Sequence, residues 1–160
     1  MLEIERKFLV KSEEFRQQAT SRKHLIQGFL STDPDRTVRV RVTDDAAYLT
    51  IKGKSSASGM SRFEWEQQIP LADGRILLEL CEQPLMEKNR YVVPVGKYTF
   101  EVDEFLGTNG GLLLAEVELQ QEEDPVLKPA WLGKEVTGQK EYYNSQLSKK
   151  PYSTWNLEEH

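Results

Sequence analysis

Cysteine and histidine are scarce in this sequence of 160 residues, which contains one cysteine, Cys81, and two histidines. A single cysteine excludes an internal disulfide bond and is typical of a reducing compartment, so we expect a cytoplasmic protein. Cys81 lies in an apolar stretch, which predicts a core residue rather than a nucleophile. Without a cluster of histidines and cysteines, the sequence supports neither a zinc site nor a Ser–His–Asp hydrolase.

Long apolar runs and an excess of basic residues are also missing. No run approaches the roughly eighteen apolar residues of a membrane-spanning helix, and Glu3 and Glu5 near the start predict no signal peptide. The formal net charge is −5, which gives no general attraction to nucleic acid. The Gly-x-x-x-x-Gly-Lys-Ser/Thr pattern of a P-loop does not occur. We therefore expect no membrane and no nucleic-acid partner, and a site for an anion must be built locally.

The length suits one domain, which we place at residues 1–150 with a polar C-terminal tail at 151–160. Seven segments alternate apolar and polar residues with the period of a β-strand. They span residues 2–10, 37–43, 48–54, 62–69, 86–94, 98–105 and 112–120. Turns are predicted at 44–47 and 95–97, so we expect a mainly β (α+β) fold.

Helical patterns are fewer. Ser12 is a candidate N-cap for a helix over 13–20, and Asp73 for a helix over 74–82 with an apolar stripe. Further short helices are predicted near 129–132 and 140–149. Trp65 falls on the apolar side of its strand, which predicts a position in the core outside the sheet.

The polar sides of the strands carry charges that are sorted by sign. Acidic pairs two residues apart are Glu3/Glu5, Glu64/Glu66, Glu101/Asp103 and Glu116/Glu118, and basic pairs are Arg39/Arg41 and Lys88/Arg90. Residues at this spacing share one face of a strand and lie about 7 Å apart. From the pattern alone, two arrangements stay open: solvated faces with cross-strand ion pairs, or a barrel whose charges point inward.

An inward arrangement would suit a polyanion bound together with metal. Mg²⁺ and Mn²⁺ prefer oxygen ligands, and Mg²⁺ binds one or two carboxylates together with the phosphates of a substrate. Arginine and lysine match phosphate oxygens. The two sets of side chains together are typical of metal-assisted phosphoryl transfer with a positioned water.

The order of these motifs resembles the CYTH superfamily, the triphosphate tunnel metalloenzymes. The first strand, Glu3–Val10, is similar to the Glu-x-Glu-x-Lys signature of this family. The other matching motifs follow in order as Gln27–Leu30, Arg39–Arg41, Leu49–Lys52, Glu87–Tyr91, Glu101–Asp103, Glu116–Glu118 and Glu135–Thr137. The resemblance covers about residues 1–148 and is strongest to short bacterial members, several of which hydrolyse inorganic tripolyphosphate.

This resemblance implies a closed eight-stranded antiparallel β-barrel, open as a tunnel, with a few flanking helices and a C-terminal helix near one mouth. It also implies Mg²⁺ or Mn²⁺ as the cofactor. The metal and water-positioning carboxylates would be Glu3, Glu5, Asp103, Glu116 and Glu118, with Glu64 and Glu101 as weaker candidates. The phosphate ligands would be Lys7, Arg39, Arg41, Lys52, Lys88 and Arg90, with Arg62 as a further candidate. Of these, Lys7, Lys52 and Lys88 are the catalytic candidates.

Two positions depart from the family pattern. Related sequences often have tyrosine where this chain has Phe29, and a phenyl ring cannot make the hydrogen bonds of a hydroxyl. A basic element near the C-terminus is replaced by Lys140-Glu141-Tyr142, where Glu141 removes positive charge if it faces the tunnel. Neither position is an expected metal ligand, so both bear on rate and substrate preference.

The leading hypothesis is a metal-dependent hydrolase of linear triphosphates, with inorganic tripolyphosphate as the small polyanionic substrate, acting as a monomer or homodimer. Two alternatives stay open. One is adenylate cyclisation, or hydrolysis of thiamine or nucleoside triphosphates, in the same tunnel, although we identify no residues that would read a base. The other is of a different class, a protein that binds polyphosphate or nucleotide without turnover.

Overall fold

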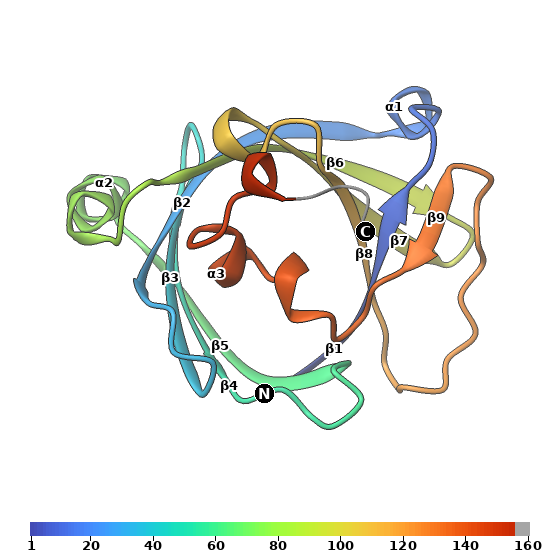
Figure 1. Ribbon diagram of the computed structural model, residues 1–160, viewed down its shortest axis with the longest axis horizontal. Helices are drawn as coiled ribbons and strands as arrows, with labels where there is room; N and C mark the ends of the chain where they lie inside the picture. The colour runs from blue at the N-terminus through green and yellow to red at the C-terminus, as the bar shows by residue number, and fades with distance from the viewer. Residues whose placement is uncertain (156–160) are drawn as a thin grey trace.

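The computed structural model describes residues 1–155, and within them the chain forms one antiparallel sheet that closes on itself. Its strands are β1 Leu2–Val10, β2 Ser21–Ser31, β3 Arg36–Val42, β4 Ala47–Gly53, β5 Ser61–Ile69, β6 Met86–Val95, β7 Tyr98–Phe105, β8 Leu113–Glu118 and β9 Leu132–Glu135. Eight of them form a ring in the order β1-β5-β4-β3-β2-β6-β7-β8, and β8 returns to β1 (Figure 1). The ninth, β9, is added beside β1.

The ring closes where β1 meets β5. Only three residue pairs join these two strands, the first being Leu2 with Phe63 and the last Ile4 with Ser61. Alternation along β1 sends Glu3 and Glu5 to an internal cavity, whereas Phe8 joins the core outside the ring. The structure therefore confirms the closed ring with a charged interior, and the alternative of solvated charged faces does not hold for this strand.

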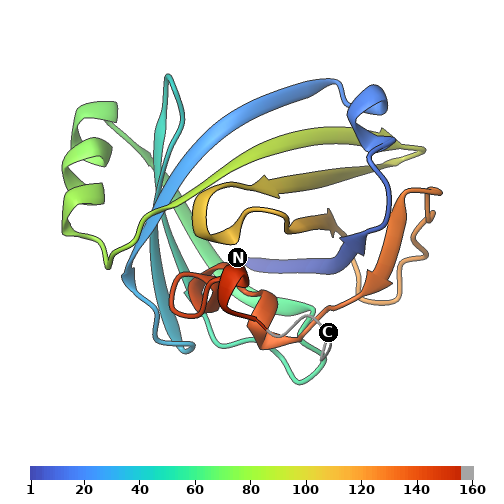
Figure 2. The ribbon, with the colours of Figure 1, turned by 45° about the horizontal axis from the view of Figure 1, so that its top comes forward.

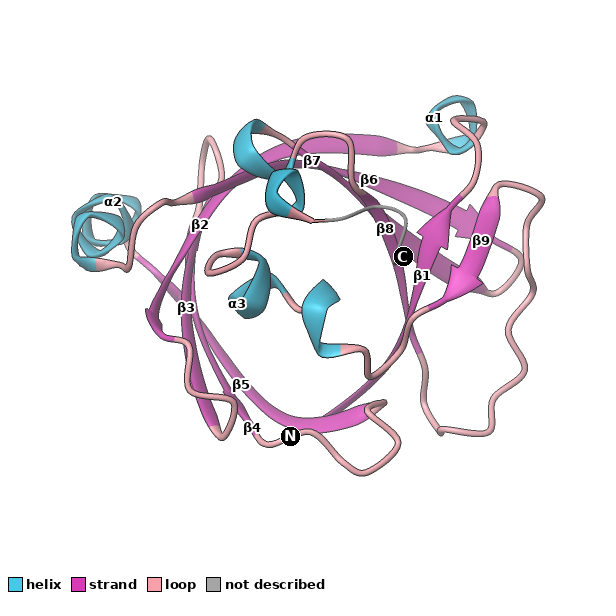
Figure 3. Ribbon diagram, in the orientation of Figure 1, coloured by secondary structure: helices cyan, strands magenta, loops and turns pink. Residues whose placement is uncertain are grey.

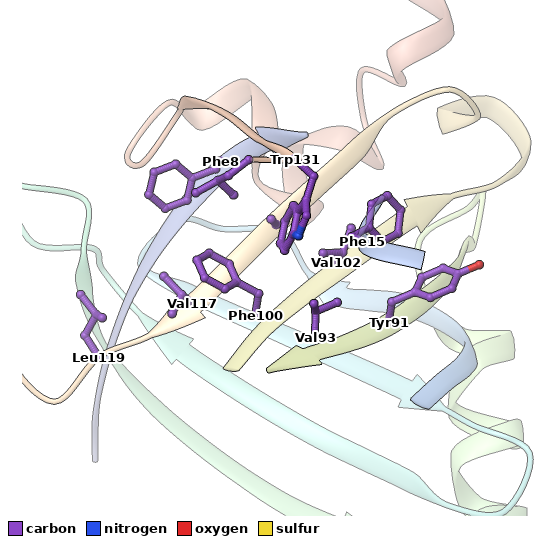
Figure 4. Close-up of a cluster of buried hydrophobic side chains, with 11 residues drawn as sticks. Phe8, Phe15, Tyr91, Val93, Phe100, Val102, Val117, Leu119 and Trp131 are labelled. Atoms are coloured by element: carbon purple, nitrogen blue, oxygen red, sulfur yellow. The ribbon is translucent and has the colours of Figure 1, made fainter. Parts of the chain in front are cut away.

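The largest core lies outside the ring, between the strands and the segments that cover them. Figure 4 shows Trp131 between Phe15 and Phe100 on the outer face of the sheet. The ring centroids of Phe100 and Trp131 are 5.4 Å apart, an edge-to-face contact. Phe15 belongs to helix α1, Phe15–Gln18, so this helix and the segment before β9 together cover one sector of the wall.

Helix α2, Leu71–Leu80, covers a second sector and stands outside the ring in Figure 2. Its Leu78 packs with Val40 and with Cys81, which is buried as predicted. Between the two covered sectors the outer wall is bare, and Trp65 is 43% exposed there. The prediction that Trp65 lies in a core was wrong, because no segment among the described residues packs over this part of β5.

Two of the predicted helices exist but have other bounds, and a third does not form. Helix α1 is shorter than 13–20, and Ser12 does not cap it, since the Ser12 hydroxyl is buried without a partner among residues 1–155. Helix α2 begins earlier than predicted because Pro70, with its fixed φ, precedes the first turn and Asp73 lies inside it. The helix predicted near 129–132 was wrong: the chain enters β9 there, since β1 offers an open side for pairing.

The C-terminal segment forms short helical turns at one end of the ring rather than one helix over 140–149. These turns are η2 Lys140–Tyr142 and α3 Asn144–Leu147, followed by η3 Tyr152–Thr154; another short turn, η1 Gly107–Asn109, precedes β8. Figure 3 shows η2 and α3 within the outline of the ring. Tyr152 and Trp155 pack against the core around Leu147. Residues 156–160 of the predicted tail lie outside the described part of the chain.

None of the helices in residues 1–155 has the length and apolar character needed to cross a membrane.

Candidate active site

A cavity of about 80 Å³ lies inside the ring. Charged side chains from six strands dominate its wall, and they comprise Glu3, Glu5, Lys7, Arg39, Lys52, Arg62, Lys88, Arg90 and Glu116. Six are basic and three are acidic, a formal surplus of three positive charges in a chain whose net charge is −5. The cavity is therefore locally suited to an anion, although the protein as a whole is acidic.

The cavity continues toward both ends of the ring. At one end it meets a space of about 650 Å³, and both are lined by Thr37, Arg62 and Tyr143. At the other end a space of about 330 Å³ shares Arg90 with the central cavity and also contacts Arg41. The three spaces in succession have the form of a tunnel through the ring.

Glu3 on β1 is paired with a lysine from β4. Lys52 Nζ donates to Glu3 Oε1 at 2.8 Å and lies 3.4 Å from Glu64 Oε2 on β5. Burial, together with a hydrogen bond to Glu64, raises the pKa of Glu3 to about 7, although Lys52 opposes the shift. Glu3 is thus poised to bind either a proton or a cation near neutral pH.

Glu5, two residues further along β1, has no ion-pair partner among residues 1–155. Burial raises the pKa of Glu5 well above its usual range, and the neighbouring Glu116 and Glu3 raise it further. A buried carboxylate beside two others is costly unless a positive charge compensates it.

Glu116 on β8 faces Lys7 on β1. Lys7 Nζ lies 3.5 Å from Glu116 Oε1 and donates to the carbonyl oxygen of Tyr142 at 3.3 Å. Burial alone would raise the pKa of Glu116, but the combined attraction of Lys7, Arg90 and Lys88 outweighs it and the pKa falls to about 2. Glu116 is therefore ionised at neutral pH.

Asp103 on β7 joins two cations of β6. Its oxygens accept hydrogen bonds from Arg90 Nε at 2.8 Å and Nη2 at 3.0 Å, and lie 2.9 Å from Lys88 Nζ. Burial lowers the pKa of Lys88 to about 8, against the attraction of Asp103. Despite its own burial, Asp103 has a pKa held well below the usual range by Arg90 and Lys88.

Arg39 and Arg41 lie on β3, in line with the predicted pair. Arg41 Nη2 donates to Glu66 Oε1 at 3.2 Å, and burial beside Arg39 and Arg90 lowers its pKa to about 10. Arg39 Nη2 donates to the Thr50 hydroxyl at 3.3 Å, while its Nε is buried with no acceptor in residues 1–155. A buried donor of this kind favours an anionic ligand.

The donor set fits a hard divalent cation in its chemistry, because Glu3, Glu5 and Glu116 present carboxylate oxygens to one cavity. In residues 1–155, no three acidic, histidine or cysteine side chains converge closely enough to hold a metal ion. Glu3 and Glu116 are instead engaged by Lys52 and Lys7. A cation could bind these carboxylates only if the two ion pairs were broken.

A model of the CYTH domain matches residues 1–152 of this sequence. The chain belongs to the CYTH family. An inorganic triphosphatase of Acetivibrio thermocellus is 46% identical over 154 residues, which cover 96% of this chain and 97% of that protein. An inorganic triphosphatase of Nitrosomonas europaea is 37% identical over 153 residues, covering 92% and 97% of the two chains.

Solved structures agree with the fold of this CYTH domain. The crystal structure of the inorganic triphosphatase NE1496 superposes with a TM-score of 0.64 at 32% identity, covering 91% of this chain and 96% of that one. The Hippeastrum protein HpAC1, described as a putative adenylyl cyclase with a dominant triphosphatase activity, gives a TM-score of 0.60 at 15% identity, covering 76% and 81%. The second similarity shows the fold alone.

Not every expected site residue of the CYTH domain lines the central cavity. Asp103 lies behind it and forms ion pairs with Lys88 and Arg90, while Arg41 and Glu101 line the space at one end. The remaining two outliers, Glu64 and Glu118, are not among its lining residues, and Glu118 is exposed. For these five residues, as for those that line the central cavity, binding of metal or substrate stays a prediction.

Sequence reasoning missed the part of the site that comes from the C-terminal segment. Tyr143, Asn144 and Ser145 line the cavity beside the charged strands. Lys7 Nζ lies 5.2 Å from the ring centroid of Tyr143, a cation–π contact. No charge pattern marks these residues, since they lie on short turns whose position depends on the whole ring.

The two positions that depart from the family pattern lie in different surroundings. Phe29 on β2 is 3% exposed and lines the cavity, so its missing hydroxyl bears directly on the site. Glu141 is exposed and lines none of the three spaces, so its negative charge does not enter the tunnel.

Proposed function

We propose that this CYTH protein is a divalent-metal-dependent hydrolase of linear triphosphates, with inorganic tripolyphosphate as its substrate. The observation that carries the proposal is the formal surplus of three positive charges around a cavity that also presents three carboxylates. Two relatives that cover almost the whole chain are inorganic triphosphatases, which supports the same substrate class. A cytoplasmic location is part of the proposal.

In this proposal Lys7, Lys52 and Lys88 bind phosphate oxygens and offset the charge that develops on them in the transition state. Each lysine is now paired with a carboxylate, and a phosphate that takes over Lys7 and Lys52 frees Glu116 and Glu3 as oxygen ligands. When bound, Mg²⁺ or Mn²⁺ would polarise phosphate oxygens and neutralise part of the substrate charge.

Two further roles are assigned to cavity groups that have no hydrogen-bond or ion-pair partner within residues 1–155. The Arg39 Nε donor has no acceptor among the described residues and binds a phosphate oxygen. Glu5 forms no ion pair within residues 1–155 and orients the attacking water. The water oxygen bonds to a terminal phosphorus and gives up a proton to solvent, the bond from that phosphorus to the bridging oxygen breaks, and the leaving pyrophosphate takes the electron pair.

The test replaces a cavity carboxylate without changing its shape. Glu5→Gln and Glu116→Gln should each reduce metal-dependent release of phosphate from tripolyphosphate by roughly 100-fold or more, because the first loses the carboxylate that orients the water and the second loses a charge toward the cation. Glu87→Gln is the matched control, since Glu87 is an exposed residue paired with His24 outside the cavity. Circular dichroism and thermal melting establish that each variant is folded.

The same assay separates the alternatives. Wild-type protein is given Mg²⁺ or Mn²⁺ with tripolyphosphate, pyrophosphate, ATP or thiamine triphosphate, and both phosphate and cyclic nucleotide are measured. Preference for tripolyphosphate supports the proposal, and a cyclic product from ATP points to a cyclase. Binding without any product indicates a polyphosphate-binding protein, and full activity in both cavity variants would sink the assignment of these carboxylates.

A further inference from the structure

The C-terminal segment supplies Asn144 to the cavity, and the two hydrogen bonds of this side chain both end on its oxygen. We propose that Asn144 is a substrate-binding residue whose amide nitrogen donates a hydrogen bond to a phosphate oxygen. The inference rests on the proposed function, and it adds a phosphate-binding residue that lies outside the charged strands.

The orientation of the Asn144 amide is fixed by two donors. Its Oδ1 accepts hydrogen bonds from Lys88 Nζ at 2.7 Å and from Gln27 Nε2 at 2.7 Å. Lys88 is 1% exposed and Gln27 is fully buried, so neither donor can turn to water instead. A flipped amide would place its NH₂ group against an ammonium and a second NH₂ group, and both hydrogen bonds to Asn144 would be lost.

The nitrogen of this amide is consequently left for a ligand. Because Oδ1 is held on one side of the planar group, Nδ2 points to the other side, and it has no acceptor within residues 1–155. Asn144 lines the same cavity as Lys88 and Lys7. An amide NH₂ group cannot bind a cation, so the partner that fits it is an oxygen of the polyanion.

Gln27 acts through Asn144 and is a positioning residue. Its Nε2 holds the Asn144 oxygen, whereas its own Oε1 is buried without a donor in the described chain. A buried acceptor without a donor costs free energy of folding. Gln27 therefore contributes through the orientation that it gives to Asn144. Gln27 does not line the central cavity and does not reach the substrate.

The decisive variant is Asn144→Asp, which keeps the shape and the oxygen that accepts from Lys88 and Gln27. It replaces the free NH₂ group by a carboxylate oxygen that repels phosphate. Binding of inorganic tripolyphosphate is measured by calorimetry in EDTA, where no metal-dependent turnover occurs. The Kd should rise about tenfold to a hundredfold, the range expected for losing a hydrogen bond to a charged group.

Asn109→Asp is the matched control. Asn109 Oδ1 likewise accepts a hydrogen bond, from the Tyr152 backbone N–H at 2.9 Å, but the residue lies outside the cavity. The control adds the same charge, and its Kd should stay within about twofold of wild type. Unchanged tripolyphosphate binding by folded Asn144→Asp protein would overturn the inference.

A second variant keeps the inference testable if Asn144→Asp does not fold. Gln27→Met removes the donor that orients Asn144 without touching the ligand, and should raise the Kd a few-fold and the steady-state KM in proportion. On the Asn144→Asp background it should add little, because the oriented donor is already absent. Wild-type binding by Gln27→Met, or full additivity of the two changes, would refute the positioning role.

Failure of the inference differs from failure of the proposed function. Wild-type protein that hydrolyses tripolyphosphate while both variants bind it normally overturns only the role of Asn144. Wild-type protein that neither binds nor hydrolyses tripolyphosphate overturns both.

Discussion

Without divalent metal, acidification from pH 7.5 to pH 5 should make the folded protein more stable. The pKa of Glu3 is raised from 4.5 to about 7 by burial, and that of Glu5 is raised in the same direction. A carboxyl group that binds its proton more tightly in the folded state destabilises that state when ionised. This cost is fully present above pH 7 and disappears as the pH falls toward 4.5.

The magnitude follows from the shift. For Glu3, a change from 4.5 to about 7 corresponds to at most about 3 kcal/mol in the free energy of unfolding. Glu116 and Asp103 have lowered pKa values, so the stability they contribute is lost only below about pH 4.5. The window from pH 7.5 to pH 5 therefore isolates the groups with raised pKa values.

Urea denaturation in EDTA, followed by circular dichroism at several pH values, measures this dependence. Glu3→Gln should flatten the curve, which separates the local effect from the general relief of charge repulsion in an acidic protein. Saturating Mg²⁺ or Mn²⁺ should reverse the trend, because the cation binds the ionised carboxylates and stabilises the folded state at higher pH. Wild-type stability in EDTA that falls or stays constant toward pH 5 would refute this reasoning.

Three further substitutions test the interior and the exterior of the wall. Phe29→Tyr places a hydroxyl in the cavity near Arg39, its partner in register on β3, and should lower the KM for tripolyphosphate by about twofold to tenfold; an unchanged KM would show that the ring does not reach the substrate. Trp65→Gln should change the free energy of unfolding by less than about 0.5 kcal/mol, whereas Trp131→Leu, at a fully buried position, should cost about 3 kcal/mol in urea denaturation. Equal costs would contradict the packing described for the outer wall.

The sequence was most informative about the strands whose charged residues alternate with apolar ones. Sorted pairs such as Glu3/Glu5 and Arg39/Arg41 predicted which residues of a strand share one face, because side chains alternate with a period of two. Glu-x-Glu alone could not distinguish an inner from an outer face. That decision depends on closure of the ring through Leu2–Ile4, which is a property of the whole chain.

The errors came from segments whose conformation depends on distant partners. Residues 129–132 have a local pattern compatible with a helix, but the open side of β1 draws the following residues into β9. Asn144 carries no charge, and its importance comes from contact with Lys88 and Gln27 on strands far away in sequence. Trp65 shows that an apolar side chain on the outer face of a strand is buried only where another segment covers it.

The pairing of β1 has a consequence for how the chain folds during synthesis. Of the nine described strands β1 leaves the ribosome first, yet its main neighbour, β8, is the eighth to be made, and Glu5 finds its position opposite Glu118 only then. Until that moment Phe8 has no core to enter, since Phe100, Val117 and Trp131 follow it by most of the length of the chain. Such long-range pairing slows folding and leaves apolar strand edges exposed to other chains. The nascent protein is thus most vulnerable to aggregation through the same strand that later carries the first carboxylates of the cavity.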